Sequence, residues 1–206
     1  DYDLYRKAAR FADKNYDRMA EKPENVRRAE YIAPNYRMSE LSGAVAIAQL
    51  DKLETICSNR YKYGDGLYEG IRDLPGIFPQ KCPEENQCSY YFGMFRIDSE
   101  VAGTDVMEFS EALKAEGVPN STGYISHCIY RSDLFQNLSA YEGTNCPFDC
   151  KHYDKEIEYP EGLCPEAEAI LQSTIRLQVN EFFTEEDMEE TIAAIRKVSK
   201  YYSERK

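Results

Sequence analysis

Hydrophobic positions recur at helical spacing along the first third of the chain. A first amphipathic helix is predicted within residues 4–20, where one face carries Leu4, Ala8 and Phe11. After a polar stretch and Pro34, Ser39 is suited to cap a second helix. Helical spacing then continues to Leu74, and Pro75-Gly76 ends it. The pattern therefore predicts one long helix over residues 39–74.

The predicted helix over residues 39–74 would span about 54 Å if it were continuous, at about 1.5 Å per residue. That length exceeds one layer of a compact domain, so we expect it to bridge two bodies or to bend near Gly64 and Gly66. Its first turns are rich in small residues, which would allow another backbone to approach closely.

The remainder of the chain mixes short strands with helices. Strands are predicted at Ile77 and Phe78, over residues 89–98, within 118–125, and at the alternating positions Ile175, Leu177 and Val179. Helices are predicted from a Thr104 cap to Glu116, over 165–171, and from a Thr184 cap to the C-terminal end. This order predicts an α+β fold with helices on one face of a mainly antiparallel sheet.

Composition narrows the classes of function. The net charge of −12 argues against a nucleic-acid partner, because phosphate backbones require clustered Lys and Arg. No apolar run approaches the roughly 18 to 20 residues that span a membrane. A small anionic ligand stays compatible with the charge, since one or two arginines suffice to bind it. We expect a cytoplasmic protein.

Seven cysteines at irregular positions favour reduced thiols over a disulfide framework. Residues 131–163 form a long aromatic-rich loop of the kind that is usually functional. Three thiols and an imidazole in and after this loop could suit tetrahedral zinc: Cys146, Cys150, His152 and Cys164. Their spacing is not that of a standard zinc finger, so we favour a structured loop near the substrate and predict no metal.

Four segments carry a resemblance to a known family. They are Asn35-Tyr-Arg-Met-Ser-Glu-Leu41 with Gln49-Leu-Asp-Lys-Leu53 after it, Glu111-Ala-Leu-Lys-Ala-Glu-Gly-Val-Pro119, Cys164-Pro-Glu-Ala-Glu168, and Thr184-Glu-Glu-Asp187. In order and spacing the chain resembles the C-terminal half of the DegT/DnrJ/StrS family of pyridoxal-phosphate (PLP) sugar aminotransferases. The first segment is the most specific of the four.

The resemblance implies the small C-terminal domain of a fold-type I PLP transferase, whose active sites lie at a homodimer interface. It divides the chain into an edge of the large domain and its connection (1–38), the bridging helix (39–74) and the small domain (75–206). The lysine that holds PLP as a Schiff base would lie in the large domain, upstream of these residues. We therefore expect no catalytic residue here and no activity from this chain alone.

The same resemblance assigns four site residues. Asn35 would reach the PLP phosphate of the neighbouring subunit, and Arg37 would contact phosphate or substrate, or else pair with an acidic neighbour. Tyr124 and His127 align with a strand end that lines the family's substrate pocket. The chain departs from the family at Ser126, where proline is usual, and at Ala33-Pro34, where glycine and an aromatic are usual.

Two functions remain open on the sequence. The first is a portion of an aminotransferase that moves an amino group from glutamate or glutamine. The acceptor would be a nucleotide-linked keto-sugar or a keto-cyclitol. The alternative is a non-catalytic ligand-binding, regulatory or dimerisation module that has lost the PLP-lysine domain.

Overall fold

The computed structural model describes residues 1–27, 31–141, 144–148 and 157–205. Its contacts divide the chain into two compact units, Asp1–Glu54 and Thr55–Lys206, called unit 1 and unit 2 below. The boundary falls inside the predicted long helix and not at either of its ends. Within the described ranges, no helix combines the length and the apolar character needed to cross a bilayer.

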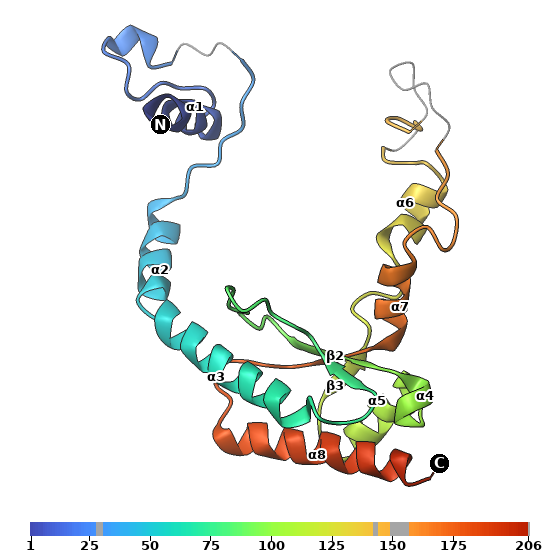
Figure 1. Ribbon diagram of the computed structural model, residues 1–206. Coiled ribbons are helices and arrows are strands. Elements are labelled where there is room, and N and C mark those ends of the chain that lie inside the picture. The colour runs from blue at the N-terminus through green and yellow to red at the C-terminus, as the bar shows by residue number, and fades with distance from the viewer. Residues whose placement is uncertain (28–30, 142–143, 149–156, 206) are drawn as a thin grey trace. The chain divides into compact units, whose positions relative to one another are not determined.

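The described residues of unit 1 form two α-helices and one 3-10 turn (Figure 1). These elements are α1 (Tyr2–Ala12), η1 (Pro23–Asn25) and α2 (Glu40–Leu50). Asp1 caps α1 and Ser39 caps α2, each accepting hydrogen bonds from backbone N–H groups of the first turn. Neither helix has a buried residue, and the buried groups of this unit are instead the polar Asp13, Asn15 and Asp17.

Unit 2 is built on a four-stranded antiparallel sheet of order β1-β2-β4-β3. Its strands are β1 (Ile77–Pro79), β2 (Gly93–Ile97), β3 (Asn120–Thr122) and β4 (Thr174–Leu177). Met94 of β2 and Ser121 of β3 stand opposite Arg176 of β4. Ile175 and Leu177 alternate with Arg176 and face the hydrophobic core, so Arg176 belongs to the other face of the sheet.

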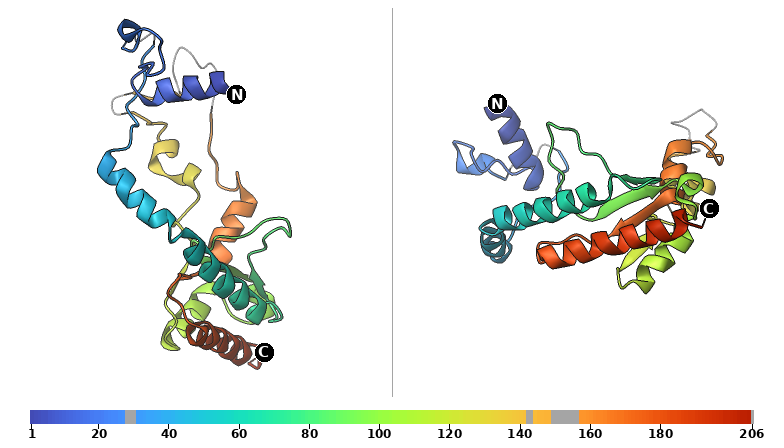
Figure 2. Two further views of the ribbon diagram at one scale, coloured as in Figure 1. Left: turned by 90° about the vertical axis from the view of Figure 1, so that its left-hand side faces the viewer. Right: turned by 60° about the horizontal axis from the view of Figure 1, so that its bottom comes forward.

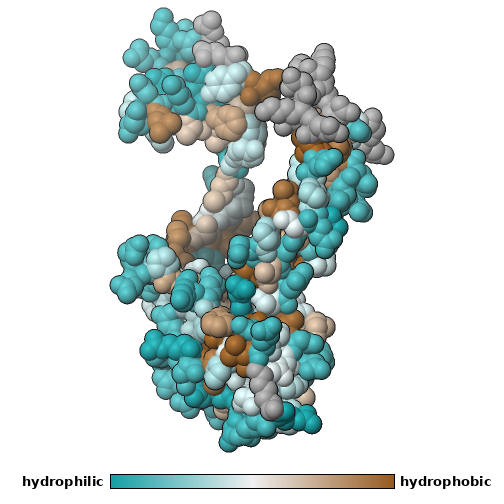
Figure 3. Space-filling model, turned by 45° about the vertical axis from the view of Figure 1, so that its right-hand side comes forward, coloured by the Kyte–Doolittle hydropathy of each residue, from teal (hydrophilic) through white to brown (hydrophobic). Residues whose placement is uncertain are grey.

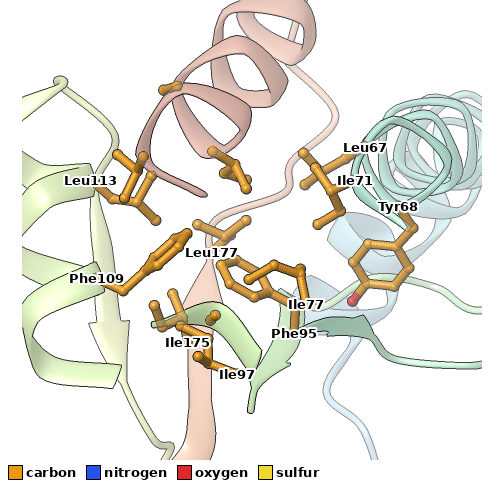
Figure 4. Packing of buried hydrophobic residues seen from close by; sticks show 14 of the residues in the cluster. Leu67, Tyr68, Ile71, Ile77, Phe95, Ile97, Phe109, Leu113, Ile175 and Leu177 are labelled. Carbon is orange, nitrogen blue, oxygen red and sulfur yellow. The ribbon is translucent and has the colours of Figure 1, made fainter. Parts of the chain in front are cut away.

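Six α-helices and one 3-10 turn accompany the sheet in the described part of unit 2 (Figure 1). They are α3 (Leu53–Ile71), α4 (Ser99–Ala102), α5 (Val106–Ala115), η2 (Ile129–Arg131), α6 (Asp133–Gln136), α7 (Pro165–Ser173) and α8 (Glu185–Ser203). Helices α3 and α8 lie side by side (Figure 2). Their apolar faces, with that of α5, form the core against the sheet, where Phe95 and Phe109 meet edge to face (Figure 4). The α+β architecture with a helix-covered antiparallel sheet is confirmed.

The predicted helix over residues 39–74 is two helices in the structure. A turn at Asp51 and Lys52 separates α2 from α3, with Lys52 N–H donating to Gln49 C=O. Helix α3 continues through Gly64 and Gly66, so the interruption of the predicted helix lies at Asp51 and Lys52 and not at these glycines. No Gly or Pro marks residues 49–52, so the local sequence gives no sign of the turn.

Gly64 and Gly66 serve close packing. A Cβ on Gly64 would lie 2.4 Å from the Tyr90 ring, and one on Gly66 would lie 2.4 Å from Met188 Sδ. Their absent side chains let α3 approach the chain at Tyr90 and helix α8. Packing, and not flexibility, accounts for both glycines.

Of the two helix caps predicted in unit 2, Thr184 is confirmed and Thr104 is wrong. Thr184 and Asp187 form a reciprocal capping box at the start of α8. The predicted cap of α5 was Thr104, but Asp105 fills that position and its carboxylate accepts from Met107 N and Glu108 N at 2.8 Å each. Hydrophilic side chains predominate on the face shown in Figure 3, in keeping with a composition that is 30% charged.

Candidate functional site

Asn35 lies in a segment that backbone hydrogen bonds fix to the end of α1. Lys14 N–H donates to Pro34 C=O at 2.8 Å, and Tyr36 N–H donates to Ala12 C=O at 2.7 Å. These bonds flank a β-bridge between Asp13 and Asn35. The position of Asn35 is therefore set by the fold of unit 1 and not only by its own turn.

A buried carboxylate organises the charges around Asn35. Asp13 is 5% exposed, and it pairs with Arg18 Nε at 2.8 Å and with Arg37 Nε at 3.0 Å. The hydrogen bond from Arg18 is the main reason that the pKa of Asp13 lies below its usual range. Of the two roles considered for Arg37, the structure displays the ion pair with an acidic neighbour.

The side chains of Asn35 and Arg37 keep donors available for a phosphate. Asn35 Oδ1 accepts a hydrogen bond from Arg37 Nε at 3.3 Å, and among the described residues Asn35 Nδ2 has no acceptor. Asn35 is exposed, and it precedes the N-terminus of α2 by a few residues. An exposed amide donor beside a guanidinium is a chemically suitable pair for an oxyanion.

Tyr124 lies in an aromatic and cationic cluster of unit 2. Its ring stacks on Phe92, with centroids 5.4 Å apart and an interplanar angle of 26°. The guanidinium carbon of Arg176 is 5.5 Å from the Phe92 centroid and 5.7 Å from the Tyr124 centroid. Arg176 Nε also donates to Ser121 Oγ at 3.2 Å. The four side chains converge on the face of the sheet opposite the core.

Unit 2 has several cavities, and one of about 440 Å³ opens beside this cluster. It is called the cavity of unit 2 below. Arg176 and Phe92 line it together with Arg60, Ser121 and three amide residues, which are Asn120, Gln178 and Asn180. The cavity has the size of a small-ligand site, and its walls combine aromatic, amide and guanidinium groups.

His127 is not among the residues that line this cavity. It is exposed, and its Nδ1 lies 2.8 Å from Ser126 Oγ. Tyr124 does not line the cavity either, but its ring contacts Phe92 and Arg176, which do. Arg176, Phe92 and Ser121 are not predicted as site residues from the sequence. Only the alternation in β4 hinted that Arg176 would face away from the core.

Of the four residues considered as zinc ligands, the structure describes Cys146 and Cys164. Cys150 and His152 lie outside the described residues. Within the described part of the chain, no group of three His, Cys, Asp or Glu side chains could hold a metal ion.

Comparison with known proteins gives consistent matches. The sequence model of the DegT/DnrJ/EryC1/StrS aminotransferase family matches residues 1–150. The chain is 21% identical over 174 residues to the spore coat polysaccharide biosynthesis protein SpsC of Bacillus subtilis, covering 83% of this chain and 40% of that protein. Over 103 residues it is 28% identical to a Micromonospora echinospora protein provisionally named L-glutamine:3-amino-2,3-dideoxy-scyllo-inosose aminotransferase, covering 49% of this chain and 25% of that protein.

Solved structures show the same fold. An aminotransferase from Psychrobacter cryohalolentis superposes with a TM-score of 0.71 at 18% identity, and the match covers 98% of this chain and 50% of that one. The chain thus spans half or less of the length of these relatives.

Proposed function

Because this chain belongs to the DegT/DnrJ/EryC1/StrS aminotransferase family, we propose that it is the C-terminal portion of a PLP-dependent enzyme. In that enzyme, glutamate or glutamine would supply the amino group, and a nucleotide-linked keto-sugar or a keto-cyclitol would receive it. The family match over residues 1–150 carries this proposal. The names of the two curated relatives, one in polysaccharide biosynthesis and one acting on an inosose, support the two acceptor classes.

PLP is the cofactor of the family's aminotransferases, and when bound it supplies the electron sink for the amino transfer. In the proposal, this chain contributes binding and orientation. Asn35 Nδ2 donates a hydrogen bond to the phosphate held by the neighbouring subunit, and Arg37 adds positive charge there. The ion pair with Asp13 fixes the guanidinium of Arg37 next to the Asn35 amide.

Tyr124 and His127 line the acceptor pocket in this proposal. Tyr124 is 57% exposed and belongs to the cluster beside the cavity of unit 2, which supports its role. For His127 the support is its exposed imidazole and its place in the matching segment. An exposed imidazole can exchange a proton or hydrogen bond with a polyhydroxylated ligand.

The proposed enzyme is a cytoplasmic homodimer. Helix α2 supports the dimer, because it carries large apolar side chains that are mostly exposed: Leu41, Val45, Ile47 and Leu50. Between them stand the small residues Gly43, Ala44, Ala46 and Ala48, which permit close approach of a partner helix. A cytoplasmic location is in keeping with the charged composition.

The proposal is tested by PLP binding in two proteins. One is the 206-residue chain, and the other is a longer protein that joins this chain to a lysine-bearing large domain of the family. Only the longer protein is expected to acquire the visible absorbance of lysine-bound PLP and to aminate a keto-sugar or keto-cyclitol. Absorbance spectra and a glutamate-dependent amination assay measure the two properties.

Asn35→Ala in the longer protein is expected to weaken PLP retention at least severalfold. Asn137→Ala, a change of the same residue type in unit 2, serves as the matched control. Visible colour in the 206-residue chain, or full PLP retention by Asn35→Ala, would contradict the assigned roles.

A further inference from the structure

The cavity of unit 2 is electropositive in an acidic protein. The chain has a net charge of −12, yet among the described residues two arginines and no Asp or Glu line the cavity. Its remaining polar walls are uncharged amides, a serine and the exposed Tyr91. A local reversal of charge of this kind favours an anionic ligand.

The two arginines of the cavity differ in what they contact. Arg60 is committed to the fold: Nη2 lies 2.8 Å from Glu181 Oε2, and Nη1 donates to Tyr90 C=O and Val179 C=O. Arg176 has no carboxylate within ion-pair distance among the described residues, and its two Nη atoms have no acceptor there. Its charge is therefore the one left for a ligand.

Arg176 is nevertheless held in place. Its Nε–H donates to Ser121 Oγ, and its guanidinium lies over both the Phe92 and Tyr124 rings. Stacking on aromatic faces stabilises the cation and leaves the edge of the guanidinium open. A guanidinium fixed on one edge presents its two Nη groups as a preformed fork for two oxygen atoms.

We propose that Arg176 is a specificity-determining residue that binds an oxyanion of the substrate in the cavity of unit 2. This inference rests on the proposed function, which offers two sources of such a group: the carboxylate of the amino donor and the phosphate of a nucleotide-linked acceptor. Both present paired oxygens to a bidentate guanidinium. Phe92, Tyr124 and Ser121 are positioning residues that act through Arg176.

The test is to titrate the 206-residue chain with each of two probes and to monitor binding through the NMR signal of the Arg176 side-chain Nε–H. L-glutamate probes the carboxylate source and pyrophosphate probes the phosphate source. We expect a saturable shift of this signal with at least one probe, and the probe with the lower Kd identifies the source. Arg176→Gln should weaken binding of that probe at least tenfold. Arg176→Lys, which keeps the charge and loses the fork, should weaken it less.

Arg96→Gln is the matched control. Arg96 lies on β2, donates to Ser173 Oγ and does not line the cavity. Salt screens the loss of a charge outside the cavity, so the Kd of the probe should stay within about twofold of the wild-type value. An unchanged Kd in Arg176→Gln, the same loss in Arg96→Gln, or no saturable shift with either probe would overturn the inference. The measurement involves neither PLP nor turnover, so its failure is distinguishable from failure of the aminotransferase proposal.

Discussion

At the scale of single residues, the buried side chains of unit 1 are polar or charged. Asp17 pairs with Arg6 Nη2 at 2.5 Å, and Asp13 pairs with two arginines. Asp13 also borders the segment that holds Asn35. A buried carboxylate without its cations would be strongly disfavoured, so the arginines and acids must be placed together.

The depressed pKa of Asp13 gives a prediction for pH dependence. A carboxylate with a folded pKa below its unfolded value of about 3.9 stabilises the fold above that value, and this contribution is lost as pH falls through the folded pKa. Asp13→Asn should therefore speed amide hydrogen exchange in residues 10–18 and 34–36 severalfold at pH 7. The difference from wild type should shrink once the pH falls below about 4.

Hydrogen exchange detected by mass spectrometry measures this effect, with exchange rates corrected for the intrinsic effect of pH. Glu24→Gln is the control, because Glu24 is exposed and has no ion pair among the described residues. Equal protection of Asp13→Asn and wild type at pH 7 would show that the ion pairs do not hold this segment.

At the scale of elements, α3 packs closely against its neighbours at two glycines, which should differ in how well they tolerate an added side chain. The atoms facing Gly64 belong to the ring of Tyr90, which is 3% exposed, has φ +47° and donates to Asp65 Oδ1 at 2.5 Å. The atoms facing Gly66 are the flexible end of Met188. A rigid, anchored ring cannot move aside, whereas a thioether can change its rotamer.

Gly64→Ala and Gly66→Ala therefore form a matched pair. Each gains up to about 1 kcal/mol of helix propensity. Gly64→Ala should nevertheless lower the free energy of unfolding of unit 2 by about 1–3 kcal/mol through overpacking, whereas Gly66→Ala should stay within about 1 kcal/mol of wild type. Urea unfolding followed by tyrosine near-ultraviolet circular dichroism compares them, and equal effects would refute the packing argument.

At the scale of the whole molecule, α2 has no buried residue although its composition is strongly apolar. Burial of one Val, Leu or Ile side chain contributes about 1.5–3 kcal/mol. Four such side chains on one exposed helix could thus support association of two chains, as the homodimer proposal requires.

A charge placed on α2 tests this role. Val45→Glu should shift the 206-residue chain from dimer towards monomer, because a carboxylate would be buried without a partner in the interface. Phe182→Glu, at an 84% exposed apolar position outside α2, should leave the assembly unchanged. Sedimentation equilibrium gives the mass of each protein. A monomeric wild type, or an equal effect of both substitutions, would rule out α2 as the dimer surface.

The sequence by itself determined the element types, most of the caps and the family. Local signals carry these features: the alternation at Ile175 and Leu177 marks a strand, and Thr184 with Asp187 marks a helix start. These signals act within a few residues and so can be read without the fold.

Only the tertiary structure decided which residues are neighbours in space. The turn at Asp51 and Lys52, the packing role of Gly64 and the ion pair of Arg37 with Asp13 each have no local signature. The same is true of Arg176, whose cavity is assembled from loops and strands more than 80 residues apart in sequence, from Phe92 to β4. The free charge of Arg176 follows from the absence of a facing carboxylate within the described residues, a property of three-dimensional neighbours.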